Sequence, residues 1–520
     1  NYSFSKYNIR FSGSQTNQAY TNHQSISRLF GDASTERVIT PYEFDGQVNK
    51  ITTGFDMFIS EKQAISVDFS YTDDTHSYEN PSSFSGSDTT DYEYLRNMDH
   101  FHEITNLGFN YRIDFNQKKQ FLELDYYLSL SDNTYPIRDF IDQSLYLTRD
   151  LTEDFQIESF AIDYHYPISD AGMIELGGSR ITQELQSSLS QQLEEDLDTL
   201  SFDYEESLLG AYASLALNFE KIKILAGLRY EYFESNALTS TNLGSDWEYG
   251  NLFPSFHLSY KLDKFNSFNV GYSKRISRPN FHHINAYQIV NPVFEWEYNP
   301  SIAPEFSHNV ELDYLKNYKK ASFRLGVFYR YKTDLILWTQ RAENNIQVFR
   351  YENADNEHSY GAEADLSVDL FDWLSTSATA NFYYSSIQSD LVTWDRIYSS
   401  RLKVKSQFKI TKFLSSDITY NYLPQQQRAF SFIKSRSRVD WAFNSSLFGG
   451  KVNANLRIID LFNTNIIDRR SEAIDLEQET SWDIQNLRRS YVLSLAYTPF
   501  SKSDFKRTKK RRRRQEVPVD

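Results

Sequence analysis

Short segments in which hydrophobic and polar residues alternate recur along the chain. In the segment 267–276, Phe268, Val270 and Tyr272 alternate with polar residues, and the same period of two recurs at 322–332 and 451–458. Successive side chains of a β-strand point to opposite faces, so this period predicts strands with one apolar and one polar face. The pattern therefore predicts an all-β protein.

Short and long connections alternate between the predicted strands. The alternating segments are about ten residues or longer, the length of a tilted strand that crosses a bilayer. Between consecutive short turns lie long polar segments such as 73–99 and 187–201, which we expect to be loops. Short turns at one end and long loops at the other are typical of outer-membrane barrels. The short turns are predicted at 61–63, 116–119, 168–171, 220–221, 263–265, 317–319, 372–373, 411–412 and 449–450.

Aromatic residues lie close to nearly every short turn, for example Phe58, Phe115, Tyr166, Phe219 and Trp373. Tyrosine and tryptophan rings favour the headgroup level of a bilayer, where an apolar ring and a polar tip are both satisfied. This repeat predicts an aromatic girdle on a transmembrane antiparallel β-barrel, with the short turns in the periplasm and the long loops outside the cell.

The turns also predict the number of strands and the domain boundaries. Nine short turns account for about eighteen strands, and an opening strand near 2–14 and a final one near 489–500 bring the total to about 20. A barrel of this chain alone could close, because the number is even. Large plugged transporters have 22 strands, and the total would be 22 if two strands precede Asn1. We expect the barrel to occupy residues 1–500. Residues 501–520, with a basic run from Lys506 to Arg514, are expected to form a periplasmic tail that meets anionic headgroups or an acidic partner.

Composition removes several other classes of protein. The net charge of -16 argues against nucleic-acid binding, and the absence of cysteine excludes disulfides and thiolate metal sites. No run of about 18 apolar residues occurs, so a spanning helix is excluded.

The chain has no recognisable catalytic motif. The adjacent His282 and His283 point to opposite sides of an extended backbone, and the acidic segment 194–206 lacks calcium-loop spacing. We therefore expect no catalytic residue, no cofactor and no resident metal.

Several motifs carry a resemblance to a known family. The segments FPSFHLSYKL, NVGYSKRISRPNF, YNPSIAPEFSHNVEL, SYGAEADLSV and IDLFNTN resemble the outer membrane protein β-barrel family of TonB-dependent receptors. In that family an arginine-proline pair ends one strand, and an asparagine-proline, proline-glutamate and serine-histidine-asparagine run opens the next. The resemblance is strongest from 228 to 382. The positions that match are Arg278, Pro279, Asn299, Pro300, Pro304, Glu305, Ser307, His308 and Asn309.

The resemblance implies a location, a function and partners. It implies a barrel in the outer membrane of a Gram-negative cell, in contact with lipid and lipopolysaccharide, for energised uptake of a siderophore, vitamin, oligosaccharide or peptide. The implied partners are a plug domain upstream of Asn1, a TonB-type energy-coupling protein and, in some relatives, a surface lipoprotein. A plugless barrel that acts as a scaffold or as part of a secretion or assembly complex is the alternative. A soluble carbohydrate-binding β-protein is disfavoured by the aromatic girdle.

The two ends of the stretch 275–314 alternate like strands, and the irregular residues between them are expected to form an extracellular loop at the barrel mouth. Pro279 cannot continue the ladder of β-strand hydrogen bonds, and Pro300 and Pro304 delay its resumption until Glu305. Its aromatic residues either contact a ligand or pack against neighbouring loops. These candidates are Phe281, Tyr287, Phe294, Trp296 and Tyr298.

The polar faces of the strands are predicted to line the lumen. On 322–332 this assigns Arg324 to the lumen and Val327 to lipid. The same face carries charges of both signs, which need water or a polar domain inside the barrel. These lumenal residues are Arg275, Arg324, Arg330, Lys332, Asp365, Asp369 and Arg457.

Overall fold

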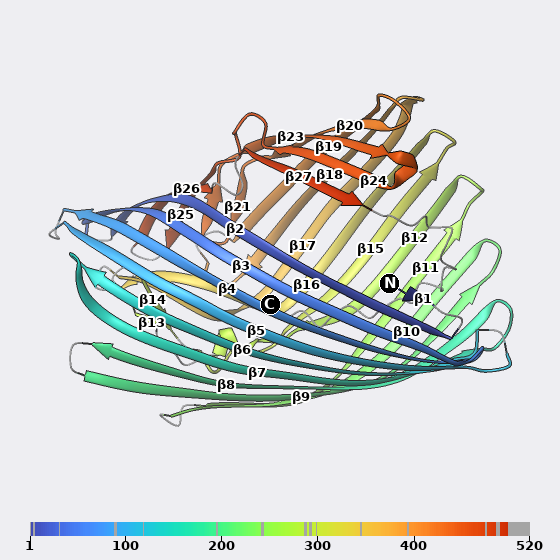
Figure 1. Ribbon diagram of the computed structural model, residues 1–520, viewed down its shortest axis with the longest axis horizontal. Coiled ribbons are helices and arrows are strands. Elements are labelled where there is room, and N and C mark those ends of the chain that lie inside the picture. Colours follow the sequence, from blue (N-terminus) through green and yellow to red (C-terminus); the bar gives the residue numbers. More distant parts are fainter. Residues whose placement is uncertain are drawn as a thin grey trace.

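Twenty long strands form the wall of one antiparallel β-barrel in the computed structural model (Figure 1). The structure describes residues 2–497 except 4–5, 31, 88–90, 118, 194–195, 241–243, 285–288, 291–293, 298, 344–345, 393–394, 474–475 and 485–488. The basic tail predicted at 501–520 lies outside the described residues. Among the described residues, no helix has the length and apolarity needed to cross a membrane.

The wall strands follow one another around the barrel, and each pairs with its neighbour in an antiparallel sense. They are β2 (Tyr7–Phe30), β3 (Thr35–Ser60), β4 (Gln63–Gly86), β5 (Tyr92–Asp114), β6 (Phe121–Ile141), β7 (Ser144–Pro167), β8 (Gly172–Leu193), β9 (Asp196–Asn218), β10 (Ile222–Thr239), β11 (Gly244–Lys261), β12 (Asn266–Ser277), β15 (Glu305–Asn317), β16 (Ala321–Glu343), β17 (Ile346–Phe371), β18 (Leu374–Gln388), β19 (Arg396–Lys409), β20 (Leu414–Leu423), β23 (Arg436–Leu447), β24 (Val452–Ile459) and β27 (Ser490–Tyr497).

Shorter elements lie at the two ends of the barrel. The segment after β12 contains α1 (Phe281–Ile284), β13 (Ile289–Val290) and β14 (Phe294–Glu297), and β14 pairs in parallel with β17. This confirms that the long connection between β12 and β15 leaves the wall. The remaining elements are β1 (Tyr2–Ser3), β21 (Gln426–Arg428), β22 (Ser431–Ile433), the 3-10 helix η1 (Phe448–Gly450), β25 (Ile467–Ala473) and β26 (Leu476–Ile484).

All nine predicted short turns join consecutive strands of the wall. For example, β3 ends at Ser60 and β4 begins at Gln63, and β17 ends at Phe371 and β18 begins at Leu374. In Figure 1 these turns gather at the right-hand end of the barrel, whereas β13, β14, β25 and β26 lie at the left-hand end. The nine short turns therefore lie at one end as predicted, whereas the other end combines the long connections with tight turns such as 142–143.

The polar segments 73–99 and 187–201 are mostly paired strand, so their local prediction as loops was wrong. β4 continues to Gly86 and β5 begins at Tyr92, with pairs from Asp73–Glu103 to Phe84–Tyr92. β8 and β9 likewise pair as far as Leu193 and Asp196. A hairpin outside the membrane satisfies its backbone through pairing, and no lipid imposes a continuous apolar outer face on it. Apolar residues are buried on its inner face only at intervals, for example Phe84, Tyr94 and Leu189, so the alternation is interrupted.

An apolar belt covers the outer face of the wall near the short-turn end. On β16, Leu325, Val327 and Tyr329 are 43%, 46% and 42% exposed, and they occupy the face opposite Arg324. On β3, the exposed Ile51 lies within the belt, whereas residues 43–49 are mainly polar. The strands thus project beyond the belt, and about ten further residues of strand add about 30 Å.

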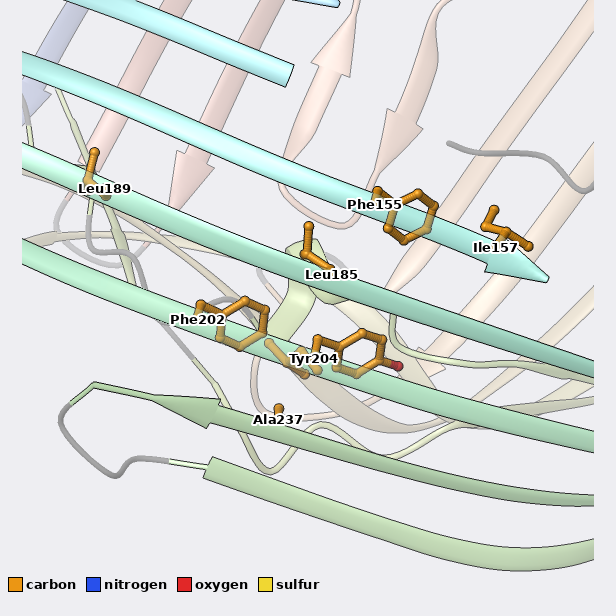
Figure 2. Packing of buried hydrophobic residues seen from close by; sticks show 8 residues of the cluster. Phe155, Ile157, Leu185, Leu189, Phe202, Tyr204 and Ala237 are labelled. Carbon is orange, nitrogen blue, oxygen red and sulfur yellow. The ribbon is translucent and has the colours of Figure 1, made fainter. Parts of the chain in front are cut away.

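Apolar side chains also gather on the inner face of the wall, beyond the belt (Figure 2). On β9, Phe202 and Tyr204 are buried, while Leu209 on the opposite face is 54% exposed. Ile284 of α1 is buried in the same cluster, and Phe281 packs against it. The connection after β12 therefore folds inward onto this face. The cluster consists of Phe155, Ile157, Leu185, Leu189, Phe202, Tyr204, Ala237 and Ile284.

The ring closes by hydrogen bonding at the long-connection end. β26 pairs with β2 over Asn22–Phe30, and β25 links β26 to β22. At the short-turn end, the described part of β27 pairs with β24 alone, and the same edge of β2 pairs with β1 through Ile9 and Asn8. The two halves of this junction are therefore built differently.

Candidate functional site

Arg278 anchors the start of the inward connection to the wall. Its Nη2 donates a hydrogen bond to Oε2 of Glu231 on β10 at 2.5 Å, and its guanidinium lies 5.1 Å from the ring centre of Phe233. Pro279 follows directly, outside any strand. Because proline has no backbone N–H to donate, the β12 ladder ends here as the sequence predicts.

The end of the same connection is fixed by Asn299 and Glu305. The side chain of Asn299 is 6% exposed, and its Nδ2 donates to the carbonyl of Tyr351 on β17 at 2.7 Å. Glu305 begins β15 and holds the ammonium of Lys332 at 2.9 Å. Pro300 and Pro304 lie between them, outside any strand. The matched motif thus places this connection against the wall.

The serine-histidine-asparagine run is divided between the two faces of β15. Asn309 is 7% exposed and accepts a hydrogen bond from Nε of Arg330 at 2.6 Å, which is a lumenal contact. Ser307 lies on the same face and accepts from Asn309. His308 lies on the outer face, where its Nδ1 is 3.0 Å from the hydroxyl of Tyr272. Only two residues of this run therefore reach the lumen.

The candidate ligand-contacting aromatics that the structure describes have aromatic neighbours. The ring centre of Phe281 is 5.8 Å from that of Phe155, and that of Trp296 is 5.0 Å from Phe349. Tyr287, Tyr298 and the side chain of Phe294 lie outside the described residues. A role in ligand contact stays a prediction for all five.

Four of the charged side chains predicted in the lumen form ion pairs with neighbouring strands, namely Arg324, Lys332, Asp365 and Arg457. Arg324 contacts Asp313 at 2.8 Å, Glu363 at 3.1 Å and Asp365 at 3.2 Å. Arg457 contacts Asp440 at 3.1 Å. The assignment of these residues to the inner face is confirmed. The wall itself supplies partners that we expected only from water or from an inserted domain.

Three histidines lie together on the inner face of β4 and β5. His76 Nε2 is 2.7 Å from His100 Nδ1, and His76 Nδ1 is 2.9 Å from a carboxylate oxygen of Asp74. The ring of His100 stacks on Tyr135 with 4.2 Å between ring centres, and His102 Nε2 is 2.8 Å from Ser131 Oγ. Burial lowers the pKa of His100, as it does that of His102.

Sequence reasoning missed this histidine group because its members are far apart in the chain. His100 and His102 are two residues apart and so share one face of a strand, which is a readable signal. Their pairing with the strand of His76 depends on the hairpin extending beyond the membrane, where we predicted a loop. Among the described residues, no three histidine, aspartate or glutamate side chains converge as metal ligands.

A carboxylate between two arginines lies farther out on the inner wall. Asp139 is 1% exposed and accepts hydrogen bonds from Arg96 Nε at 2.7 Å and from the hydroxyl of Tyr94 at 2.8 Å, and Arg149 contacts it as well. Burial alone would raise the pKa of Asp139, but the arginine contacts outweigh it and hold that pKa below its usual range.

A second part of the mouth is formed by β21 and β22, which pair with β19 and β25. A cavity of about 700 Å³ lies between these strands and the walls of β16 to β19. Its lining includes Trp338, Glu357 and Tyr383 from the wall and Arg428 and Arg469 from the shorter strands. The barrel mouth thus offers a partly open site with aromatic, apolar and charged groups.

A sequence model of the outer membrane protein beta-barrel family matches residues 106–497. The chain belongs to this family. The match confirms the resemblance drawn from the motifs, and it places this outer membrane β-barrel in the outer membrane of a Gram-negative cell. A comparison with curated protein sequences finds no match.

Solved structures share the fold of this outer membrane β-barrel. The copper transporter OprC has a TM-score of 0.60 and 10% identity, covering 90% of this chain and 80% of that one. FpvA of P. aeruginosa, bound to heterologous pyoverdines, has a TM-score of 0.59 and 9% identity, with coverages of 89% and 71%. The FrpB iron transporter from Neisseria meningitidis has a TM-score of 0.53 and 10% identity, with coverages of 89% and 80%.

Proposed function

We propose that this chain is the barrel of a TonB-dependent receptor that imports a scarce nutrient across the outer membrane. The observation that carries the proposal is the mouth, where β21 and β22 face β16 to β19 across a partly open cavity of about 700 Å³. A simple diffusion pore has no need of a cavity lined by aromatic, apolar and arginine side chains. The fold shared with copper and iron transporters supports the same conclusion.

The proposal includes a plug domain upstream of Asn1 and a TonB-type protein that supplies energy from the inner membrane. A barrel of this width needs an occupied lumen if it is to retain a gradient. Two further strands between β27 and β2 accompany the plug in this proposal. The edge contact of β1 with Ile9 supports them, because unpaired strand edges are not tolerated in lipid.

Other partners follow from the surfaces of the barrel. The apolar belt around residues such as Val327 supports contact with lipid and the acyl chains of lipopolysaccharide. For 501–520, we propose that the basic run meets anionic headgroups or an acidic periplasmic partner. A surface lipoprotein would sit over the projecting hairpins. The imported nutrient is a siderophore, vitamin, oligosaccharide or peptide.

Uptake by a deletion strain tests the proposal. Cells that lack the gene should lose uptake of one nutrient from a panel of these four classes, and the full-length gene should restore it. Dissipating the proton gradient across the inner membrane should abolish the restored uptake within minutes. Unchanged uptake of every nutrient would favour the alternative, a plugless scaffold or a component of a secretion or assembly complex.

A further inference from the structure

Five arginines lie together on one side of the barrel mouth, although the chain carries a net charge of -16. Arg401 belongs to β19, Arg428 to β21, and Arg469 to β25, while Arg436 and Arg438 begin β23. Desolvation and the neighbouring Arg428, Arg401 and Arg438 lower the pKa of Arg436. The local potential here is therefore positive in an otherwise acidic protein.

Four of these arginines have no acidic partner among the described residues. Arg438 is paired with Asp440 at 3.0 Å, but no such contact occurs for Arg401, Arg428, Arg436 or Arg469 in the part of the chain that the structure describes. Nε and Nη1 of Arg436 and Nε of Arg469 are buried and lack a hydrogen-bond acceptor. A buried guanidinium that lacks its acceptors is costly, so an anion at this place would stabilise the fold.

Two of the five arginines line the cavity of about 700 Å³ at the mouth. Arg428 and Arg469 line it directly, and the guanidinium carbon of Arg469 is 5.4 Å from the ring centre of Trp338. The only carboxylate among the lining residues, Glu357, is already bound by the hydroxyl of Tyr383 at 2.6 Å and of Ser359 at 2.8 Å. The cavity thus presents the guanidinium groups of Arg428 and Arg469 beside aromatic and apolar walls.

We propose that this cavity binds the anionic group of the imported nutrient, a small molecule with two or more carboxylate or phosphate groups. The inference rests on the proposed import function and narrows its substrate class. Guanidinium groups bind carboxylate and phosphate oxygens in a bidentate manner, which gives orientation as well as attraction. Trp338 and the apolar lining residues contact the uncharged part of the same molecule.

The position of the arginines favours a diffusible ligand over a lipid headgroup. Arg438 pairs in register with Asn421 on the inner face of β20, whereas the neighbouring Tyr420 is 38% exposed on the outer face. Arg436 lies two residues from Arg438 and shares its face. Lipid phosphates lie outside the wall, so a molecule that enters through the mouth is the anion that reaches this site.

Calorimetric titration of the full-length protein in detergent tests the site, with citrate and inorganic pyrophosphate as probes and glucose as the uncharged control. At least one anion should bind, glucose should not, and binding should weaken at least tenfold in the R428Q/R469Q double variant. Arg470 provides the matched control, because it lies next to Arg469 on the other face and pairs with Glu472 at 3.0 Å. R470Q should bind like the parent protein.

Equal anion binding by the parent protein and the double variant would overturn the inference, and so would binding of neither anion. The double variant could also bind the anions as tightly as the parent protein and yet lose thermal stability without any probe. In that case a carboxylate of the protein itself occupies the site, and the inference again fails. A measurement of nutrient uptake distinguishes failure of the anion site from failure of the proposed import function. Nutrient uptake that requires the gene but is unchanged in the double variant would reject the anion site and leave the import function standing.

Discussion

Arg324 and Val327 lie three residues apart on β16 and on opposite faces of the barrel wall. Arg324 contacts three carboxylates on the lumenal side, while Val327 is 46% exposed within the apolar belt. The two side chains therefore meet different solvents at nearly the same depth, which gives a sharp test of the topology.

Replacing Val327 with arginine should destabilise the barrel by about 2–4 kcal/mol, because a charge then faces lipid near the midplane. Arg324→Ala should cost about 1 kcal/mol or less, since the ion pairs that it removes are partly solvated. Refolding into liposomes over a urea series measures both. Equal losses in the two variants would contradict the assignment of faces.

Removing the carboxylate of Asp139 should loosen the outer part of β5 to β7. Asp139→Ala leaves Arg96 and Arg149 buried beside each other, and breaking such a buried pair costs about 3–5 kcal/mol. Protease nicking of the hairpins on intact cells measures the effect. Asp150→Ala is the matched control, because Asp150 is 49% exposed and its pair with Arg138 is solvated, so nicking should hardly change.

Acid should loosen the hairpin that carries His100. Burial lowers the pKa of His100 in the folded state, so the unfolded hairpin binds a proton more readily. The groups facing it are His76, His102, Asp74 and Asn133. The hairpin should be most stable above about pH 6.5, the ordinary pKa of histidine, and its stability should fall as the pH drops below that value. Amide exchange of β4 and β5, corrected for intrinsic rate, should rise from pH 7 to 5.5 in the parent protein. The dependence should be weaker in His100→Gln, and an identical pH profile in both would reject the idea.

Cysteine labelling should distinguish the two ends, because the chain has no native cysteine. Gln143 lies in the turn between β6 and β7 at the long-connection end, and Lys451 follows the short turn after β23. An impermeant maleimide should label Gln143→Cys on intact cells and leave Lys451→Cys unlabelled until the outer membrane is opened. The reverse result would invert the barrel.

The plug proposal predicts that the barrel of residues 1–520 conducts ions freely when it is expressed alone. In planar bilayers the present chain should show a conductance far above that of the full-length protein, because the wall charges keep the lumen wet. If both conduct equally little, another element fills the lumen. The plug proposal would then fail, and the scaffold alternative would move ahead.

Period-two alternation was sufficient to predict the wall and the direction of its side chains. It identified the nine short turns at one end of the barrel, though not the two-residue turn 142–143 at the other end. It also assigned Val327 and Arg324 to the correct faces, because lipid and lumen impose opposite polarities on one strand. The same rule failed at 73–99, where polar residues interrupt the alternation and only a few apolar residues such as Phe84 and Tyr94 mark the inner face. The histidine group and the arginine-lined cavity join strands distant in sequence, so only the registers and the inward folds bring them together.

The pairing of β4 with β5 as far as Phe84 and Tyr92 has a consequence for capture kinetics. A flexible loop loses conformational entropy when it closes on a molecule. A hairpin that is already hydrogen-bonded has lost that entropy during folding. A mouth built from such preorganised hairpins holds its contact groups in place before an encounter. Affinity at this entrance should therefore depend mainly on how slowly a captured molecule escapes.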